Sequence, residues 1–138
     1  MGAGTLEHHH TVLLVDDDED LREAVAILAA THGVNAIAVA GADDALSRLR
    51  NGLRPCLIVL DLSMPGKDGL AFRREQMGDP QFANIPVVVM SGAGSATEEQ
   101  ARKLGLRIFL RKPADPADLL RLFGTYCAAT VVRSPRSA

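Results

Sequence analysis

Acidic side chains stand at two places where an apolar run of the sequence ends. Asp16 and Asp17 follow the run Thr11–Val15, and Asp61 follows the run Leu57–Leu60. An unbroken apolar run of this length is typical of a strand that is buried on both faces of a parallel sheet. Because open parallel α/β sheets bind ligands at the carboxyl ends of their strands, these carboxylates are the first candidates for chemistry.

Three carboxylates at one sheet edge repel one another, and a cation among them would keep all three ionised. An oxygen-only ligand set without Cys or His indicates a hard ion, Mg²⁺ or a close relative. A carboxylate can also act as a nucleophile toward phosphorus and form an acyl phosphate. The spacing therefore favours phosphoryl chemistry in which one acid is the nucleophile and the others hold a metal.

Two further polar residues follow apolar runs. Ser91 comes after Pro86–Met90, and Lys112 comes shortly after Arg107–Leu110. A hydroxyl and a lone ammonium group suit the remaining oxygens of a phosphoryl group. Each residue alone is more typical of a surface loop, but all of them stand at strand ends in a consistent order, which favours one shared active edge.

Helical periodicity separates the apolar runs. We expect strands near residues 11–15, 34–39, 57–60, 86–90 and 107–110, and helices after Asp20, over 42–50, from about 68 to 78, over 95–104 and from Asp115 onward. Asp18, Glu19 and Asp20 read as capping residues of the first helix. The alternation predicts an α/β fold, a doubly wound five-stranded parallel sheet flanked by five helices, with the strand ends on one side.

Length and composition set the broad class. The chain has 138 residues, 47% of them hydrophobic, and a net charge of −2, which indicates one globular domain and no polyanionic partner. No apolar run is long enough to cross a membrane and no secretory pattern is evident, so we expect a cytoplasmic protein. Cys56 and Cys127 lack metal-ligand spacing, and we expect two buried thiols.

The domain boundaries follow from composition. Residues 1–10 read as a disordered leader or tag remnant, and whether the histidines His8–His10 are native is open. Residues 11–129 form the predicted domain. Residues 130–138, rich in Arg, Ser and Pro, read as a flexible tail too short to hold a nucleic-acid-binding domain.

The chain resembles a response-regulator receiver domain, of the kind paired with histidine kinases in two-component signalling and chemotaxis. The resemblance covers about residues 11–123 and rests on a set of motifs: Val15-Asp16-Asp17, Leu60-Asp61, Met64-Pro65, Asp68-Gly69, Met90-Ser91-Gly92 and Lys112-Pro113. It implies a flavodoxin-like sheet with strand order 2-1-3-4-5. It also implies that Asp61 accepts a phosphoryl group from a kinase phosphohistidine.

The resemblance implies the metal ligands as well. Asp17, Asp61 and the backbone carbonyl of Ser63 would ligate Mg²⁺, and Asp16 would act mainly through a metal-bound water.

Three further positions take their roles from the same resemblance. Ser91 would hydrogen-bond the phosphoryl group and serve as a switch residue, and Lys112 would pair with that group. Phe109 would be the switch aromatic, without the hydroxyl that a Tyr would bring. The Lys112–Pro113 peptide is expected to be cis.

The implied partners are a sensor histidine kinase or phosphotransfer protein and an unknown downstream protein, with no direct nucleic acid and no membrane. The cognate kinase and the pathway stay open, as does a homodimer through the last two helices. The domain would catalyse only its own phosphorylation and dephosphorylation. It would either stand alone or belong to a longer response regulator or hybrid histidine kinase.

Two other functions compete with this interpretation. A Mg²⁺-dependent phosphohydrolase with an Asp nucleophile usually carries a second acid two residues later, where this chain has Ser63. A binding module that works without phosphorylation would not need the full set of acids, hydroxyl and lysine. Labelling with acetyl phosphate and Mg²⁺ would separate both from a phosphorylation switch.

Overall fold

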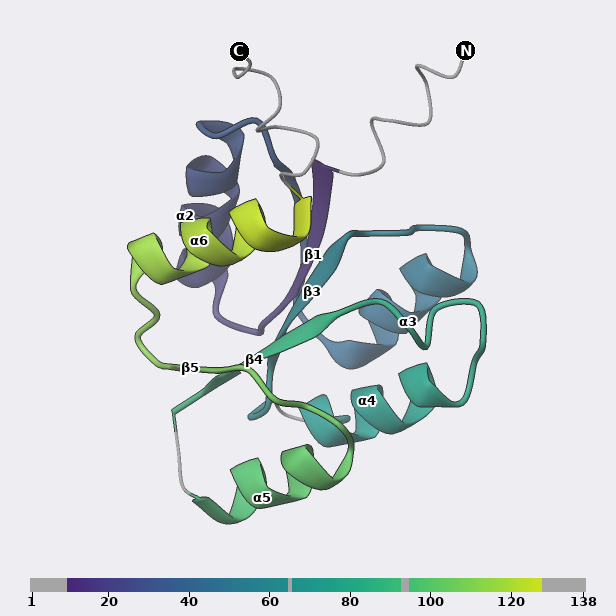
Figure 1. Ribbon diagram of the computed structural model, residues 1–138. Coiled ribbons are helices and arrows are strands. Elements are labelled where there is room, and N and C mark those ends of the chain that lie inside the picture. Colours follow the sequence, from purple (N-terminus) through teal and green to yellow (C-terminus); the bar gives the residue numbers. More distant parts are fainter. Residues whose placement is uncertain (1–9, 65, 93–94, 128–138) are drawn as a thin grey trace.

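The centre of the molecule is a parallel sheet. The computed structural model describes residues 10–64, 66–92 and 95–127, and within them five strands pair in the order β2-β1-β3-β4-β5 (Figure 1). The fold class and the strand order are therefore as predicted. The strands are β1 (Thr11–Val15), β2 (Asn35–Val39), β3 (Leu57–Asp61), β4 (Val87–Ser91) and β5 (Phe109–Arg111).

Helices cover both faces of this sheet, as Figure 1 shows. Helices α2 and α6 lie together on one face, and helices α3, α4 and α5 lie on the other. Their bounds are α2 (Glu19–Ala30), α3 (Ala42–Arg50), α4 (Gly69–Met77), α5 (Ser95–Lys103) and α6 (Pro116–Cys127). Each helix connects two parallel strands or follows the last one, which is the doubly wound arrangement.

Alternating residues of the strands build the two sides of the core. Val12 and Leu14 of β1 pack toward α2 and α6, whereas Leu13 and Val15 pack toward α3 and α4. All of the residues of β3 are buried, from Leu57 to Asp61. A central strand with no solvent-facing row explains why the sequence shows a continuous apolar run there instead of an alternating one.

Capping residues fix the beginnings of three helices. The side chain of Asp18 accepts hydrogen bonds from the backbone of Asp20 and Leu21, and Asp68 caps α4 in the same manner through Ala71. Asp115 accepts a hydrogen bond from Ala117 at the start of α6. The predicted cap role of Asp18 is confirmed, and Glu19 and Asp20 lie in the first turn of α2.

The last strand differs slightly from its predicted range. It was expected over 107–110, but β5 begins at Phe109, which is paired with Val89, and continues through Arg111. The side chain of Arg107 explains the late start, since its Nη1 atom donates to the carbonyl oxygens of Arg102 and Leu106 and closes the turn after α5. The shift brings Lys112 to the position directly after the strand.

The prediction of two separate buried thiols is wrong. Cys56 and Cys127 are joined by a disulfide, and their Cα atoms are 5.7 Å apart. The two residues are separated by 71 positions, so sequence spacing gave no indication of the pairing. Helix α6 runs back along the sheet and ends beside the residue that precedes β3, and this tertiary arrangement brings the two sulfur atoms together.

No helix in the part of the chain that the structure describes is long and apolar enough to span a membrane. The predicted leader over 1–10, apart from His10, and the predicted tail over 130–138 lie outside the described residues, as does Pro65 of the Met64-Pro65 motif.

Candidate functional site

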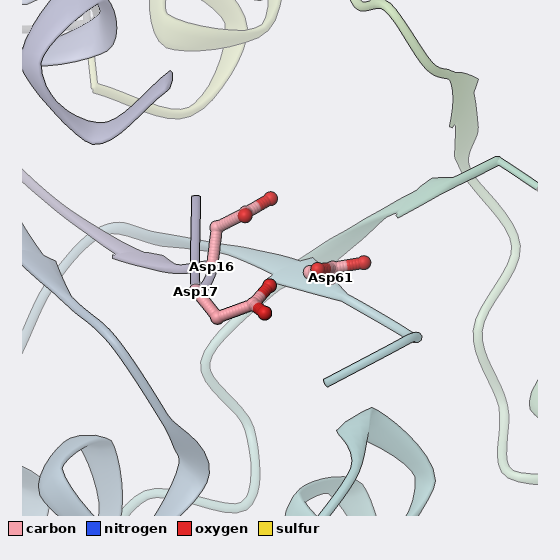
Figure 2. A group of neighbouring side chains, drawn as sticks. All are labelled: Asp16, Asp17 and Asp61. Carbon is pink, nitrogen blue, oxygen red and sulfur yellow. The ribbon is translucent and has the colours of Figure 1, made fainter. Parts of the chain in front are cut away.

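Three carboxylates meet at the carboxyl edge of the sheet. Asp16 and Asp17 directly follow β1, and Asp61 is the last residue of the adjacent strand β3 (Figure 2). The register pairs Val15 with Leu60, which brings the acids at the two strand ends level with each other. One carboxylate oxygen from each residue lies within 4.8 Å of the others. The three acids that were predicted to share one edge are therefore brought together.

Backbone hydrogen bonds hold two of these carboxylates. Oδ1 of Asp16 accepts a hydrogen bond from the backbone N–H of Asp18 at 2.8 Å, and Oδ1 of Asp61 accepts one from Ser63 at 3.0 Å. Both residues are buried, whereas Asp17 is exposed. The cluster therefore has two fixed carboxylates at its floor and one on its solvent side.

Lys112 joins the two buried acids. Its Nζ atom lies 3.1 Å from Oδ2 of Asp16 and 3.1 Å from Oδ2 of Asp61. Both Oδ2 atoms are buried, and neither accepts a hydrogen bond of regular geometry from the described residues. Among these residues, Lys112 is their charge partner. Because a carboxylate oxygen has more than one acceptor position, both oxygens retain capacity to face a second positive group.

The electrostatics reflect an excess of negative charge. Burial above all, and then repulsion from Asp16, raise the pKa of Asp61 above its ordinary value, against the opposing hydrogen bond from Ser63 and the charge of Lys112. Burial alone would lower the pKa of Lys112, but the carboxylates of Asp16 and Asp61 outweigh it and raise that pKa. One ammonium group does not compensate three carboxylates, so the site as it stands favours an additional cation.

Ser91 reaches the same edge from the next strand. The register pairs Asp61 with Met90, so Ser91 ends β4 one residue beyond the level of Asp61, and it is buried. The backbone N–H of Lys112 donates to the carbonyl oxygen of Ser91 at 3.0 Å, which fixes Lys112 beside β4. The Lys112–Pro113 peptide is cis, as predicted.

Phe109 lies at the start of β5, on the same strand that leads to Lys112. Its side chain is partly buried against the cluster around α5, and the guanidinium carbon of Arg102 lies 4.8 Å from the centre of its ring. Arg102 also approaches Glu98 at 3.9 Å. Arg102 is a contact of the predicted switch aromatic that sequence reasoning missed, and its position on a separate element offered no local signal.

Gly69 is a second residue whose importance the sequence did not reveal. A Cβ atom on Gly69 would lie 2.5 Å from the backbone oxygen of Asp61 and 2.9 Å from Cα of Leu62. The first turn of α4 therefore lies against the chain that carries Asp61. The signal in the sequence is a glycine at the first helical position, where most residues would form the helix better, but the Asp68-Gly69 motif alone does not indicate which backbone the helix approaches.

Arg22 supports the site from α2. Its Nη1 atom donates to the backbone oxygen of Asp16 at 3.0 Å. This bond ties the first turns of α2 to the end of β1, so the helix that follows the acidic cluster also steadies it.

The site is a cluster of carboxylates at one edge of the sheet, two of which pair with the same lysine. Comparison with known proteins identifies the family of the chain. The family model for the response regulator receiver domain matches residues 12–123 of the chain. The chain is a member of the response regulator receiver domain family.

Curated relatives and solved structures agree. The receiver domain is 32% identical over 119 residues to an uncharacterised 14.6 kDa protein of Leptolyngbya boryana, covering 86% of this chain and 90% of that protein. It is 34% identical over 111 residues to the response regulator Rre1 of Synechocystis, covering 79% of this chain and 48% of the relative. A response regulator receiver protein from Pseudomonas putida superposes with a TM-score of 0.77 at 32% identity, covering 83% and 95% of the two chains.

The lengths of these relatives separate two kinds of protein. The receiver domain spans nearly the whole of the Leptolyngbya boryana protein but about half of Rre1. The shared part is therefore the receiver domain of two-component response regulators, and what lies outside it in the longer relatives has no counterpart in the described residues.

Proposed function

We propose that this receiver domain is a phosphorylation switch in which Asp61 accepts a phosphoryl group from a phosphohistidine. The single observation that carries the proposal is the position of the Asp61 carboxylate. It ends the fully buried strand β3 beside Asp16 and Asp17, and its Oδ2 atom lies 3.1 Å from Nζ of Lys112. A nucleophile, a metal-binding cluster and a phosphate-pairing cation are thus combined at one strand end.

The proposed reaction moves one phosphoryl group. A carboxylate oxygen of Asp61 attacks phosphorus, the bond between phosphorus and the imidazole nitrogen breaks, and the imidazole leaves with the electron pair. Lys112 pairs with an oxygen of the transferred group, and the hydroxyl of Ser91 hydrogen-bonds another. The hydrogen bond from Ser63 to Oδ1 of Asp61 holds the carboxylate in place during the attack.

The donor set fits Mg²⁺, which we propose as the cofactor. Asp17, Asp61 and the backbone carbonyl of Ser63 would hold the ion, and Asp16 would act through water. When bound, Mg²⁺ supplies positive charge to the phosphoryl oxygens. The proposal is supported by the oxygen-only cluster and by the capacity that Oδ2 of Asp16 and Oδ2 of Asp61 retain beyond their pairing with Lys112.

The wider role follows from the family. We propose that the domain works in the cytoplasm, receives its phosphoryl group from a sensor histidine kinase or a phosphotransfer protein, and passes the signal to a downstream protein through a change around Ser91 and Phe109. It would catalyse only its own phosphorylation and dephosphorylation. The half-length match to Rre1 supports the alternative that the domain belongs to a longer regulator or hybrid kinase.

Small phosphoryl donors test this function without knowledge of the kinase. The protein is incubated with phosphoramidate or acetyl phosphate, with Mg²⁺ or with EDTA, and its intact mass is followed. We expect the addition of one phosphoryl group with Mg²⁺ and none with EDTA. Release of the donor's phosphate without stable labelling would instead indicate a phosphohydrolase, and no reaction with either donor would favour a binding module.

A further inference from the structure

The disulfide lies at the edge of the sheet opposite to the acidic site. Cys56 directly precedes β3, whereas Asp61 is the last residue of that strand. Cys127 is the last residue of α6 and is buried, with 1% of its surface exposed. The bond therefore fastens the end of α6 to the strand that carries the proposed phosphoacceptor, without contacting the acceptor's edge.

The last turn of α6 depends on this attachment. The buried residues of the helix are Leu119, Phe123 and Cys127, and the partly buried Tyr126 packs against the same core, so the disulfide at Cys127 is the covalent attachment of the last turn. Gly124 is the weakest helix former of the last turn, and the turn has no basic residue to interact with the helix dipole. The hydroxyl of Thr125 donates to the carbonyl oxygen of Arg121, a local bond that does not attach the turn to the sheet. Without the disulfide, we expect this turn to fray.

The reduced form of the pair also fits the structure. Sγ of Cys56 lies 3.1 Å from the backbone oxygen of Thr11, so a thiol at this position would have a hydrogen-bond acceptor. Cys127 belongs to the apolar cluster between α6 and the sheet, an environment that suits a protonated thiol. Both oxidation states are compatible with the same backbone, because a Cα–Cα distance of 5.7 Å needs no rearrangement to form the bond.

We propose that Cys56 and Cys127 form a reversible oxidation site that controls the last turn of α6. The oxidant is a low-molecular-weight disulfide of the glutathione type. Two protein thiols transfer two electrons and two protons to one such disulfide, which becomes two thiols as the bond between the cysteines forms. The cytoplasmic setting of this site rests on the proposed function, and disulfides of cytosolic proteins are usually transient, catalytic or redox-sensing.

Partial exposure determines where exchange begins. Cys56 is partly exposed and Cys127 is buried, so an incoming thiolate attacks the sulfur of Cys56 and releases the thiolate of Cys127. Oxidation follows the reverse course through a mixed disulfide at Cys56. The variant Cys127→Ala should therefore accumulate a glutathione adduct at Cys56, whereas Cys56→Ala should accumulate little at Cys127.

The experiment equilibrates the whole chain in glutathione buffers that range from all disulfide to all thiol, traps free thiols by alkylation and counts them by mass. We expect conversion between no free thiols and two free thiols within this range, while the protein stays folded. Reduction should lower the Tm by about 5–10 °C and increase hydrogen exchange at 124–127 more than at 116–120. The double variant Cys56→Ala, Cys127→Ala should not respond to the buffers.

Two results would overturn the proposal: a pair that stays oxidised throughout the range, which is a permanent cross-link, or a pair that stays reduced throughout. Equal hydrogen-exchange rates of the last turn in the two oxidation states would contradict the proposal that the disulfide controls this turn of α6. None of these measurements uses a phosphoryl donor, so they test the redox proposal even if Asp61 fails to be labelled. Conversely, labelling of Asp61 in both oxidation states would support the proposed function even if the redox proposal failed.

Discussion

Lys112 and the three acids show how single residues divide the work of the site. Asp16 and Asp61 are buried, fixed by backbone hydrogen bonds and paired with one lysine, while Asp17 faces solvent. Asp18, the next acid in the sequence, turns away to cap α2. Four neighbouring or clustered carboxylates therefore have separable roles, and substitutions should separate them.

Asp17→Ala should weaken Mg²⁺ binding by at least about tenfold and block labelling, because it removes a proposed direct ligand. Asp18→Ala should leave Mg²⁺ affinity unchanged and lower the free energy of unfolding by about 1 kcal/mol, because it removes the cap of α2. A metal titration and denaturant unfolding of both variants check these expectations. Equal losses of Mg²⁺ affinity would show that the ligands are misassigned.

The raised pKa of Asp61 predicts a pH-dependent cost to stability in the absence of Mg²⁺. Below its ordinary value of 3.8 the carboxyl is protonated in both folded and unfolded chains, so there is no cost. As pH rises toward the folded pKa, the unfolded chain loses the proton first, and the folded state becomes relatively less stable. Asp61→Asn should therefore gain Tm relative to the parent as pH rises from about 3.8 to neutrality. A gain that shrinks over this range would contradict the account.

The elements bring these residues together through one topological fact. Parallel strands with right-handed crossovers place all of their carboxyl ends at one edge of the sheet. The order of the apolar runs in the sequence was therefore sufficient to predict that Asp16, Asp61, Ser91 and Lys112 share this edge. Contacts between elements were not predictable in this way. The approach of Gly69 to the backbone of Asp61, the stacking of Arg102 on Phe109 and the Cys56–Cys127 bond each join segments whose packing no local pattern encodes.

Gly69→Ala tests the contact between α4 and β3. The added Cβ would overlap the backbone oxygen of Asp61, so α4 must shift, at a cost of about 1–3 kcal/mol, and phosphoryl labelling should slow. Gly124→Ala is the matched control, because a Cβ there meets no atom within 4 Å and the residue is helical. It should stabilise the protein by about 0.5–1 kcal/mol. Thermal unfolding and labelling rates compare the two, and a neutral Gly69→Ala would refute the close approach.

The fold as a whole concentrates an excess of negative charge at one edge of the sheet, while apolar side chains fill the layers between the sheet and the helices. Helices α2 and α6 on one face and α3, α4 and α5 on the other leave the carboxyl edge as the place where buried charge gathers. The sheet holds this imbalance because the strands that carry the acids are anchored by cores on both sides. Binding of a cation at this edge should therefore increase the free energy of unfolding of the whole domain.

Mg²⁺ at ten times its Kd should stabilise the parent domain by about 1.4 kcal/mol, since it binds the folded state. K⁺ at matched ionic strength should not reproduce the effect. Asp17→Ala, with its weaker Mg²⁺ binding, should reduce the gain at the same Mg²⁺ concentration to about 0.4 kcal/mol or less. Differential scanning calorimetry gives the comparison. An equal shift with K⁺ would show screening of surface charge in place of a site.

The most direct measurement maps the phosphorylated residue. The parent domain is labelled with acetyl phosphate and Mg²⁺ and reduced with borohydride, which converts an aspartyl phosphate to homoserine, and its peptides are sequenced by mass spectrometry, with Asp61→Asn and Asp44→Asn treated in parallel. We expect homoserine at position 61 in the parent and in Asp44→Asn, and none at any position in the folded Asp61→Asn variant. Homoserine at another aspartate in the parent, or full labelling of Asp61→Asn, would contradict the assignment of Asp61 as the phosphoacceptor.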